Sequence, residues 1–480
     1  MWKRKVSALA AYGSGLKPSR DSRDRALMHV MDTLPQEIIS PIVSFIPRYD
    51  DDEGVRCISL NDGGGWSAPA ISQLPLYATL SRTWNKVIEA RTFKTLAVQY
   101  TELASFRSFV TVSRHEYVTH LTYRILLPSH GDKPYGKAEH IIAFLSIMKD
   151  WEKNGVRTAV ALSIPSGAIL CNTDNAKKSH AVLAAESHLS PSRSIVQFLI
   201  TVPGFMLLNI QSLSVNCTVR HLITPTTGPI LARAFPSLRE FHLVFGGNYW
   251  PPRAPRNIPV APHIRYRQDL LDALRDVRLQ PRSVASIIDE AVHDCRSYVG
   301  NILPPADSYD SFSATMRKFS NTLKSLTLTA RLDATMFWPS EHEVHATIPT
   351  WPFLKTLRVE VDVEAPDGEL YIGFRNQSVN LAPMNRFLQA LAKAVQNMPV
   401  PDHFQVRWAP ADPHFEICYH APGPDVYGDK DGDNLSRRIY YEVDHDRRLD
   451  RAIMKGLQCA DLEKYDGTVV ARFLHGLNWN

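Results

Sequence analysis

Six short segments of the chain share one pattern of apolar positions. Each segment is six residues long, with apolar residues at its first, fourth and sixth positions. The six are Phe93/Leu96/Val98, Val118/Leu121/Tyr123, Ile210/Leu213/Val215, Leu238/Phe241/Leu243, Leu323/Leu326/Leu328 and Leu354/Leu357/Val359. Alternation of apolar and polar positions is typical of a β-strand with one buried face. The pattern predicts a strand in each segment, although single hexads of this kind also arise by chance in an apolar chain.

Two further features indicate that these segments belong to a repeat. Three of them share a lead-in: Phe235-Pro236-Ser237-Leu238, Phe319-Ser320-Asn321-Thr322-Leu323 and Trp351-Pro352-Phe353-Leu354. Some first positions lie 25, 28 and 31 residues apart (93 to 118, 210 to 238, 323 to 354), which resembles the interval of one leucine-rich repeat or slightly more. Such a unit buries its apolar face only by stacking on its neighbours. We therefore expect an α/β fold in which residues 93–400 form an irregular leucine-rich-repeat-like solenoid of strands and helices.

Other segments of this body predict helices and a different C-terminal part. One helix is predicted from Val284, Ile287, Ile288, Ala291, Val292 and Cys295, and another from Met384, Phe387, Leu388, Leu391 and Val395. From about residue 401 to 480 we expect a cap on the solenoid. Its predicted elements are short, hairpin-like strands at 403–408, 414–419 and 438–443, a loop at 425–434 and a helix at 446–458.

The N-terminal part predicts two helices separated by a loop. The first begins near Thr33, with Pro35 in the first turn and Gln36 closing a capping box, and Pro41 predicts a kink or two short helices. Residues 47–73 are acidic and glycine-rich and predict a loop. Leu76, Leu80, Trp84, Val87 and Ile88 then recur at helical spacing.

Composition and charge exclude several classes of protein. The chain has 480 residues, of which 44% are apolar and 21% charged, as in an ordinary globular protein. Its six cysteines form no CxxC pair, so we expect reduced thiols, neither a zinc site nor a disulfide framework, and a cytoplasmic or nuclear location. We expect no membrane span and no signal peptide.

Basic residues gather in two places. Residues 1–25 contain seven basic and two acidic residues, which accounts for the whole net charge of +5. We interpret residues 1–30 as a flexible basic leader, and binding to nucleic acid is the less favoured alternative. Residues 251–267 contain five prolines and four arginines and predict an extended surface segment, either a plain linker or a strip that binds a partner.

No constellation of residues predicts an enzyme, a cofactor or a metal site. Phosphate-binding and nucleophile-elbow motifs are absent. The sequence Glu341-His342-Glu343-Val344-His345 lacks the i, i+4 histidines of a zinc helix, and we interpret it as a surface loop. The acids Asp425, Asp429, Asp431 and Asp433 do not fit a calcium loop. Asp444-His445-Asp446 is better interpreted as a charged helix start.

One constellation in the N-terminal part resembles a known family. Leu34-Pro35-Gln36-Glu37-Ile38-Ile39, with Ile42 and Phe45, is followed downstream by Leu80-Ser81-Arg82-Thr83-Trp84-Asn85-Lys86-Val87-Ile88. Both halves, in this order, resemble an F-box, here spanning residues 31–92 with an insertion at 47–73. The arrangement is similar to F-box proteins of filamentous fungi, in which a repeat-like region follows the F-box.

The resemblance implies a mechanism that brings proteins together without bond chemistry on this chain. F-box helices pack on the Skp-type adaptor of a cullin–RING ubiquitin ligase, and the repeat region holds an unknown target protein. The implied contacts to the adaptor are Leu34, Pro35, Ile38, Ile39, Ile42, Leu80 and Trp84. Several of them, Ile38 and Trp84 above all, are equally compatible with the small core of the F-box itself. The alternatives are a repeat-fold interaction protein with a decayed F-box and, least favoured, an unrecognised enzyme.

Overall fold

The structure of the protein is a computed structural model, which describes most of the chain in segments. They are residues 35–45, 82–99, 102–124, 137–154, 160–164, 205–216, 226–245, 260–289, 300–305, 308–343, 346–372, 379–398, 402–409, 415–421, 437–442, 457 and 469–474. The chain is mixed α/β and divides into two compact units, Met1–Thr95 and Leu96–Asn480. Among the described residues, no helix combines the length and apolar character that a membrane crossing requires.

The first unit contains two described helices that pack on each other: α3 (Gln36–Phe45) and α5 (Arg82–Lys94). Ile39 of α3 and Trp84 of α5 are both completely buried. Of the two expectations at Pro41, the break into two short helices is wrong, because α3 is a single helix through this residue. Proline removes one backbone donor from the turn that precedes it, and a helix can continue when only that bond is lost. The expected cap at Thr33 and the loop at 47–73 lie outside the described residues.

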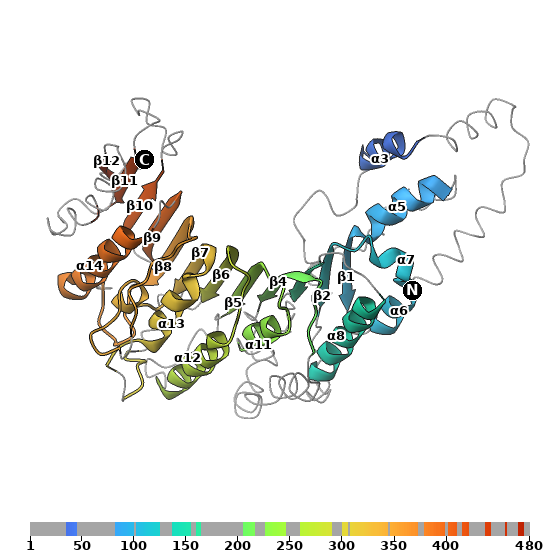
Figure 1. Cartoon of the computed structure of the whole chain (residues 1–480). Coiled ribbons are helices and arrows are strands. Elements are labelled where there is room, and N and C mark those ends of the chain that lie inside the picture. Colours follow the sequence, from blue (N-terminus) through green and yellow to red (C-terminus); the bar gives the residue numbers. More distant parts are fainter. Residues whose placement is uncertain are drawn as a thin grey trace, which may run out of the picture. The chain divides into compact units, whose positions relative to one another are not determined.

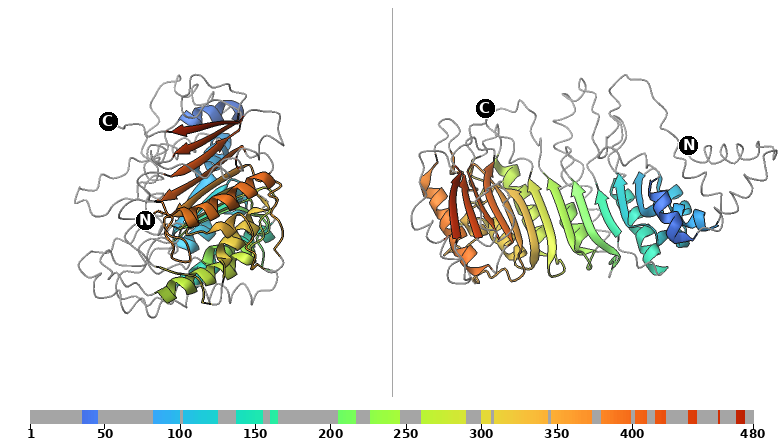
Figure 2. Two further views of the ribbon diagram at one scale, coloured as in Figure 1. Left: turned by 90° about the vertical axis from the view of Figure 1, so that its left-hand side faces the viewer. Right: turned by 90° about the horizontal axis from the view of Figure 1, so that it is seen from above.

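The second unit is built on a sheet whose strands stand in the order of the chain. Twelve strands, β1 to β12, lie side by side in the same order as in the sequence (Figures 1 and 2). They are β1 (Thr95–Gln99), β2 (His120–Arg124), β3 (Val160–Ile164), β4 (Ile210–Asn216), β5 (Glu240–Phe245), β6 (Ser283–Asp289), β7 (Leu323–Ala330), β8 (Thr356–Asp362), β9 (His403–Ala409), β10 (Glu416–His420), β11 (Arg437–Glu442) and β12 (Val469–Leu474). From β2 to β9 the strands pair in parallel, whereas β10 is antiparallel to both of its neighbours. The pairing of β11 with β12 is parallel again.

The larger described helices of this unit lie along one face of the sheet (Figure 1). The helical elements are α6 (Leu103–Phe109), α7 (Val112–His115), α8 (Lys137–Lys153), α11 (Thr227–Arg233), α12 (Val260–Arg275), α13 (Ser311–Ser320), the 3₁₀ turn η4 (Ala334–Met336) and α14 (Leu381–Asn397). A Cβ added to Gly228 of α11 would lie 2.9 Å from Leu243 of β5, so this helix lies very close to the sheet. At the other end, Phe387 of α14 packs edge-on against Trp408 of β9 with ring centroids 5.3 Å apart.

The core between the sheet and these helices consists of two ladders of apolar side chains in register across the strands. The first ladder is Leu121, Leu162, Leu213, Phe241, Ala285, Leu326, Leu357, Phe404 and Tyr419. The second is Val215, Leu243, Ile287, Leu328, Val359, Val406 and Ile417. No member is more than 2% exposed, so every second residue of each strand contributes to one continuous core.

The six predicted strand segments all coincide with strands, but three strands were not expected. Strands β3 and β12 were missed, and the helix predicted from Val284 is wrong over its first part because β6 occupies Ser283–Asp289. In β6 the buried residues alternate, as Ser283, Ala285 and Ile287. A segment rich in β-branched residues at this spacing fits either period, and the neighbouring strands decide it. Residues 290–299 lie outside the described part.

Other expected elements have mixed outcomes. The helix predicted near Met384 is confirmed as α14, and the predicted strands at 403–408, 414–419 and 438–443 are confirmed as β9, β10 and β11. The hairpin expectation holds for β9 and β10, but β9 also pairs in parallel with β8 and so continues the main sheet. The extended segment predicted at 251–267 is wrong from Val260 onward, where α12 begins. The predicted loop at 425–434, and the helix at 446–458 apart from a single residue, lie outside the described residues.

Candidate functional site

The residues implied to contact an adaptor divide into buried and exposed ones. In α3 the neighbours Ile38 and Ile39 point in different directions, since Ile38 is 50% exposed and Ile39 is fully buried. Pro35, just before the helix, is exposed. Trp84 is fully buried, as are its helical neighbours Val87 and Ile88, within 7%. The helix pair therefore has its own small core, and the exposed apolar surface lies at the start of α3.

Three of the implied contacts cannot be placed in this way. Leu34 and Leu80 lie outside the described residues, and Ile42 is described only as a residue of α3, without its side chain. The structure thus brings Ile39 and Trp84 into one core from segments 45 residues apart in the sequence. It leaves Pro35 and Ile38 at the surface, available for a partner.

The second candidate site is the face of the sheet opposite the apolar ladders, which we call the open face because no described helix packs on it. Its central row of directly paired residues is Ser214, His242, Ser286, Thr327, Arg358, Gln405, Cys418 and Tyr440. Most of these side chains are polar, and those of β4 to β9 keep part of their surface in contact with solvent. A polar row across many strands can offer hydrogen-bonding groups to a protein that is laid against it.

Charged side chains of the open face are paired with one another near its C-terminal strands. Arg407 of β9 pairs with Glu360 of β8 at 2.8 Å, and Gln405 donates to Glu416 of β10 at 2.9 Å. The hydroxyl of Thr329 donates to Glu360 at 3.4 Å. These contacts join adjacent strands through their side chains, and Arg358 is the exposed cation of the central row.

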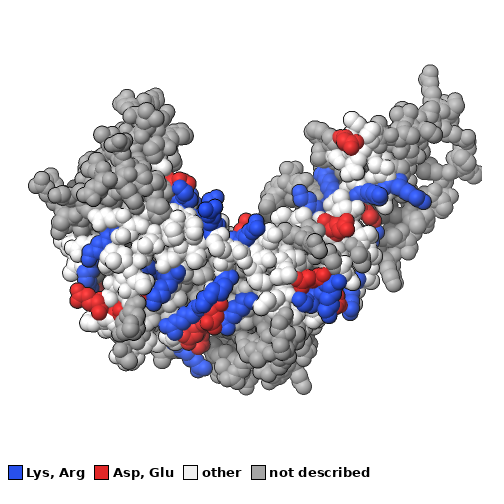
Figure 3. All heavy atoms as spheres, in the orientation of Figure 1, with Lys and Arg blue, Asp and Glu red and all other residues white. Residues whose placement is uncertain are grey.

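On the other face of this unit, basic and acidic side chains stand side by side over the helices (Figure 3). Arg233 pairs with Asp276 at 2.7 Å, and Arg275 pairs with Asp272 at 3.0 Å. These pairs are exposed and contribute little to stability. The helices in this view therefore present mixed charge, which does not favour the binding of a polyanion there.

A buried polar cluster lies where strands β7 and β8 end. Asp310 caps α13 by accepting from the backbone N–H groups of Phe312 and Ser313, and it also pairs with Arg267 of α12. Arg331, just after β7, pairs with Asp362 at 3.1 Å and with Glu364 at 2.7 Å. All of these charged groups have partners of opposite sign. We assign this cluster to joining α12 and α13 to the ends of β7 and β8.

The predicted surface loop at residues 341–345 is confirmed for Glu341 and His342, which are exposed in a turn, but not for Glu343. Glu343 is buried and pairs with Arg317 of α13 and with Lys318. Hydrogen bonds from these two side chains lower the pKa of Glu343 more than burial raises it, so the carboxylate is charged. His345 and the acids of 425–433 and 444–446 lie outside the described residues.

A third candidate site was not found from the sequence. His403 of β9 and Cys418 and His420 of β10 lie together on the open face, with one ligand atom of each within 4.8 Å of the others. The three residues include no CxxC pair, and His403 lies 15 residues before Cys418 in the chain. The signal that could have found this group is Cys418-Tyr419-His420 on a strand, because residues i and i+2 share a face.

Comparison with known proteins identifies none of these sites. No protein-family model, no curated protein and no solved structure matches the chain.

Proposed function

We propose that the chain is a substrate-recognition adaptor of a cullin–RING ubiquitin ligase. In this proposal the unit that contains α3 and α5 is an F-box that docks a Skp-type adaptor. The body is a leucine-rich-repeat-like solenoid that holds a target protein on its open face. The chain itself catalyses no reaction, and the ubiquitin transfer belongs to another subunit of the ligase.

The observation that carries the proposal is the packing of α3 on α5. The two F-box-like motifs are separated by a long insertion, yet Ile39 from the first motif and Trp84 from the second share one core. Ile38 and Pro35, which belong to the same motif as Ile39, stay exposed. An exposed apolar side chain next to a filled core is what a helix-in-groove contact needs.

The sheet supports the second half of the proposal. A parallel sheet with strands in chain order and helices on one face is the arrangement expected when strand–helix units stack. Stacking of this kind leaves the other face as an extended surface for binding. The polar central row from Ser214 to Cys418 fits that use better than an apolar row would, because it is stable in water without a partner.

The test of the F-box is a binding experiment with a purified Skp-type adaptor. We expect Ile38→Ala to weaken binding about 5- to 30-fold while the melting temperature stays unchanged, since an exposed apolar anchor contributes about 1–2 kcal/mol to an interface. Ser40→Ala, at an exposed position of the same helix, is the matched control and should bind like wild type. Ile39→Ala should lose binding and stability together.

The same experiment decides between the proposal and its alternative. If wild type and the Ile38→Ala variant capture equally little adaptor, the chain has no ligase role. A repeat-fold interaction protein with a decayed F-box would then be the better interpretation, and the body would still be expected to bind its partner.

The open face is tested by comparing the proteins retained by matched charge reversals. Arg358→Glu changes the exposed cation of the central row, and Arg275→Glu makes the same change on the helical side. We expect a specific target to be lost with Arg358→Glu and kept with Arg275→Glu. Equal retention by both variants would place the binding surface elsewhere.

A further inference from the structure

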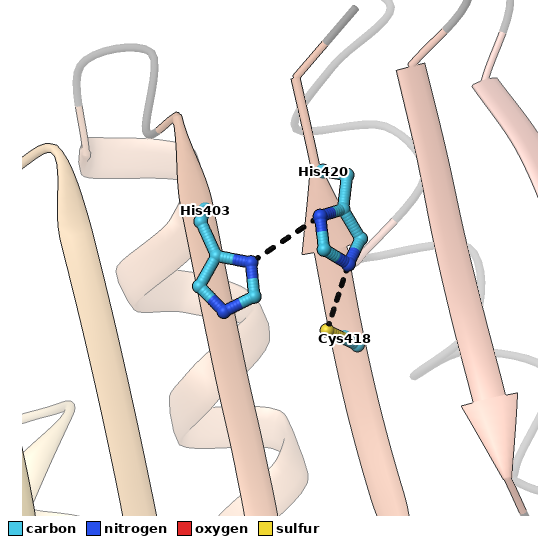
Figure 4. A group of neighbouring side chains, drawn as sticks. All are labelled: His403, Cys418 and His420. Atoms are coloured by element: carbon cyan, nitrogen blue, oxygen red, sulfur yellow. Dashed lines mark hydrogen bonds between the residues drawn. The ribbon is translucent and has the colours of Figure 1, made fainter. Parts of the chain in front are cut away.

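The pair of strands β9 and β10 places two histidines and a cysteine in one small volume (Figure 4). His403 lies directly opposite His420 in the antiparallel register, and Cys418 is two residues before His420 on the same strand. The Nδ1 atoms of the two histidines are 3.3 Å apart, and Sγ of Cys418 is 3.2 Å from Nε2 of His420. The three side chains thus come from the paired strands β9 and β10 and share the open face.

Hydrogen bonding alone does not satisfy this group. Between the two Nδ1 atoms, one histidine must donate and the other must accept. In either direction Nε2 of His403 is left over, and it is buried without a hydrogen bond of normal geometry. The neighbouring Gln405 donates its amide to Glu416 at 2.9 Å. The nitrogen without a hydrogen bond of normal geometry, the thiol and the second imidazole together form a group of electron-pair donors that a metal ion can join.

The distances suit a tetrahedral metal ion after small rotations of the side chains. Zinc binds imidazole nitrogen at about 2.0–2.1 Å and thiolate sulfur at about 2.3 Å, which sets neighbouring ligand atoms about 3.3–3.6 Å apart. Sγ of Cys418 and Nε2 of His420, 3.2 Å apart, already lie near this range. The 3.3 Å contact to His403 uses the other nitrogen of His420, and one ligand atom of each residue lies within 4.8 Å of the others. The ring of His403 can turn about its Cβ–Cγ bond and present either nitrogen.

We propose that His403, Cys418 and His420 form a binding site for Zn²⁺. A set of two imidazoles and one thiolate matches the borderline softness of this ion better than that of Mg²⁺ or Ca²⁺. No fourth histidine, cysteine or acid joins the three among the residues that the structure describes. The fourth position is therefore left for water or for a donor from a protein bound on the open face. The site would also join β9 to β10 where the sheet changes from parallel to antiparallel.

The experiment is a titration of the full chain with Co²⁺, which gives tetrahedral ligand-field absorption and a sulfur-to-metal charge-transfer band. We expect wild type to bind one equivalent more than Cys418→Ser or His420→Gln. The affinity should fall by more than about 100-fold in each variant, because loss of an outer partner of a metal ligand already costs about 10–100-fold. His242→Gln, on the same face but on β5, is the matched control and should bind like wild type.

A second readout is stability. Zn²⁺ should raise the melting temperature of wild type and of His242→Gln, and should not raise that of the cluster variants. If Cys418→Ser does not fold, His403→Gln and His420→Gln carry the test. Equal stoichiometry and equal affinity in wild type and the cluster variants would overturn the proposal, as would a zinc-edge absorption spectrum of wild type with no sulfur ligand. Tight binding of Cu⁺ without binding of Zn²⁺ would overturn the assignment of the metal.

Discussion

Asp333 accepts a hydrogen bond from the backbone N–H of Asp310, with Oδ2 3.3 Å from the nitrogen. The two acids thus belong to one cluster, although Asp310 has Arg267 as its partner and Asp333 has hydroxyl and backbone donors. Removal of the carboxyl group from water, and then the charge of Asp310, raise the pKa of Asp333 from 3.8 to about 7. Asp333 therefore keeps its proton to a higher pH than an ordinary aspartic acid.

The first prediction concerns stability against pH. Between pH 4 and pH 7 the folded chain holds a proton on Asp333 that the unfolded chain has released, so its contribution to stability falls as the pH rises. Asp333→Asn imitates the protonated side chain. Its free energy of unfolding relative to wild type should therefore increase from pH 4 to pH 7, by roughly 2–4 kcal/mol. Urea unfolding of wild type and Asp333→Asn at several pH values measures this, and a difference that does not change with pH would contradict it.

The second prediction compares two cations that pair with Glu343. Arg317 is only 2% exposed, whereas the side chain of Lys318 is 61% exposed. Replacement of Arg317 by Met leaves Glu343 with one exposed partner and should cost about 3–5 kcal/mol. Lys318→Met should cost less than about 1 kcal/mol. Urea denaturation of both variants at neutral pH is the measurement, and equal losses would contradict the assigned burial of the pair.

The third prediction concerns two glycines with a positive φ angle. Gly300 has φ of 78° and open space where a Cβ would stand, whereas Gly368 has φ of 86° and the backbone nitrogen of Asn301 only 2.8 Å from that position. Gly300→Ala should lose about 1–2 kcal/mol from the left-handed conformation alone. Gly368→Ala adds a clash with backbone and should lose distinctly more. Thermal unfolding of the two variants checks the order.

The fourth prediction concerns Trp351, which is buried to within 1% and donates its indole N–H to Oγ of Ser320 at 2.6 Å. Ser320→Ala leaves that donor without an acceptor and should cost about 1–3 kcal/mol. Combined with Trp351→Phe, which removes the donor, the same serine change should cost less. A double-mutant cycle measures the difference. Strict additivity of the two changes would show that this hydrogen bond contributes nothing.

The strands were predictable where their apolar residues alternate within one short segment. Leu213 and Val215, or Leu326 and Leu328, carry this signal locally, and both pairs are fully buried in the ladders. The segment at Val284–Ile288 has its apolar residues at spacings that suit both a helix and a strand, and its state depends on β5 and β7 on either side. Local pattern cannot contain that information, because the pairing partners come from about 40 residues away in either direction.

The candidate sites show the same limit. Each F-box-like motif is a continuous stretch of sequence, so Pro35 and Ile38 could be named from the sequence. Which of Ile38 and Ile39 is buried depends on how α5 packs against α3. The group of His403, Cys418 and His420 depends on the register of a hairpin. A shift of that register by one residue would turn the two strands' residues to opposite faces and separate the ligands.

The chain-order sheet has a consequence for the way the protein is made. From β2 to β9 each strand pairs with the strand that was synthesised just before it. Each strand that emerges from the ribosome therefore has its pairing partner already synthesised, and the sheet can lengthen by one strand at a time. β10 has to reverse direction before it can add, and β11 reverses direction again, so the hairpin at β9 and β10 is the first step at which this strand-by-strand growth changes from parallel to antiparallel pairing.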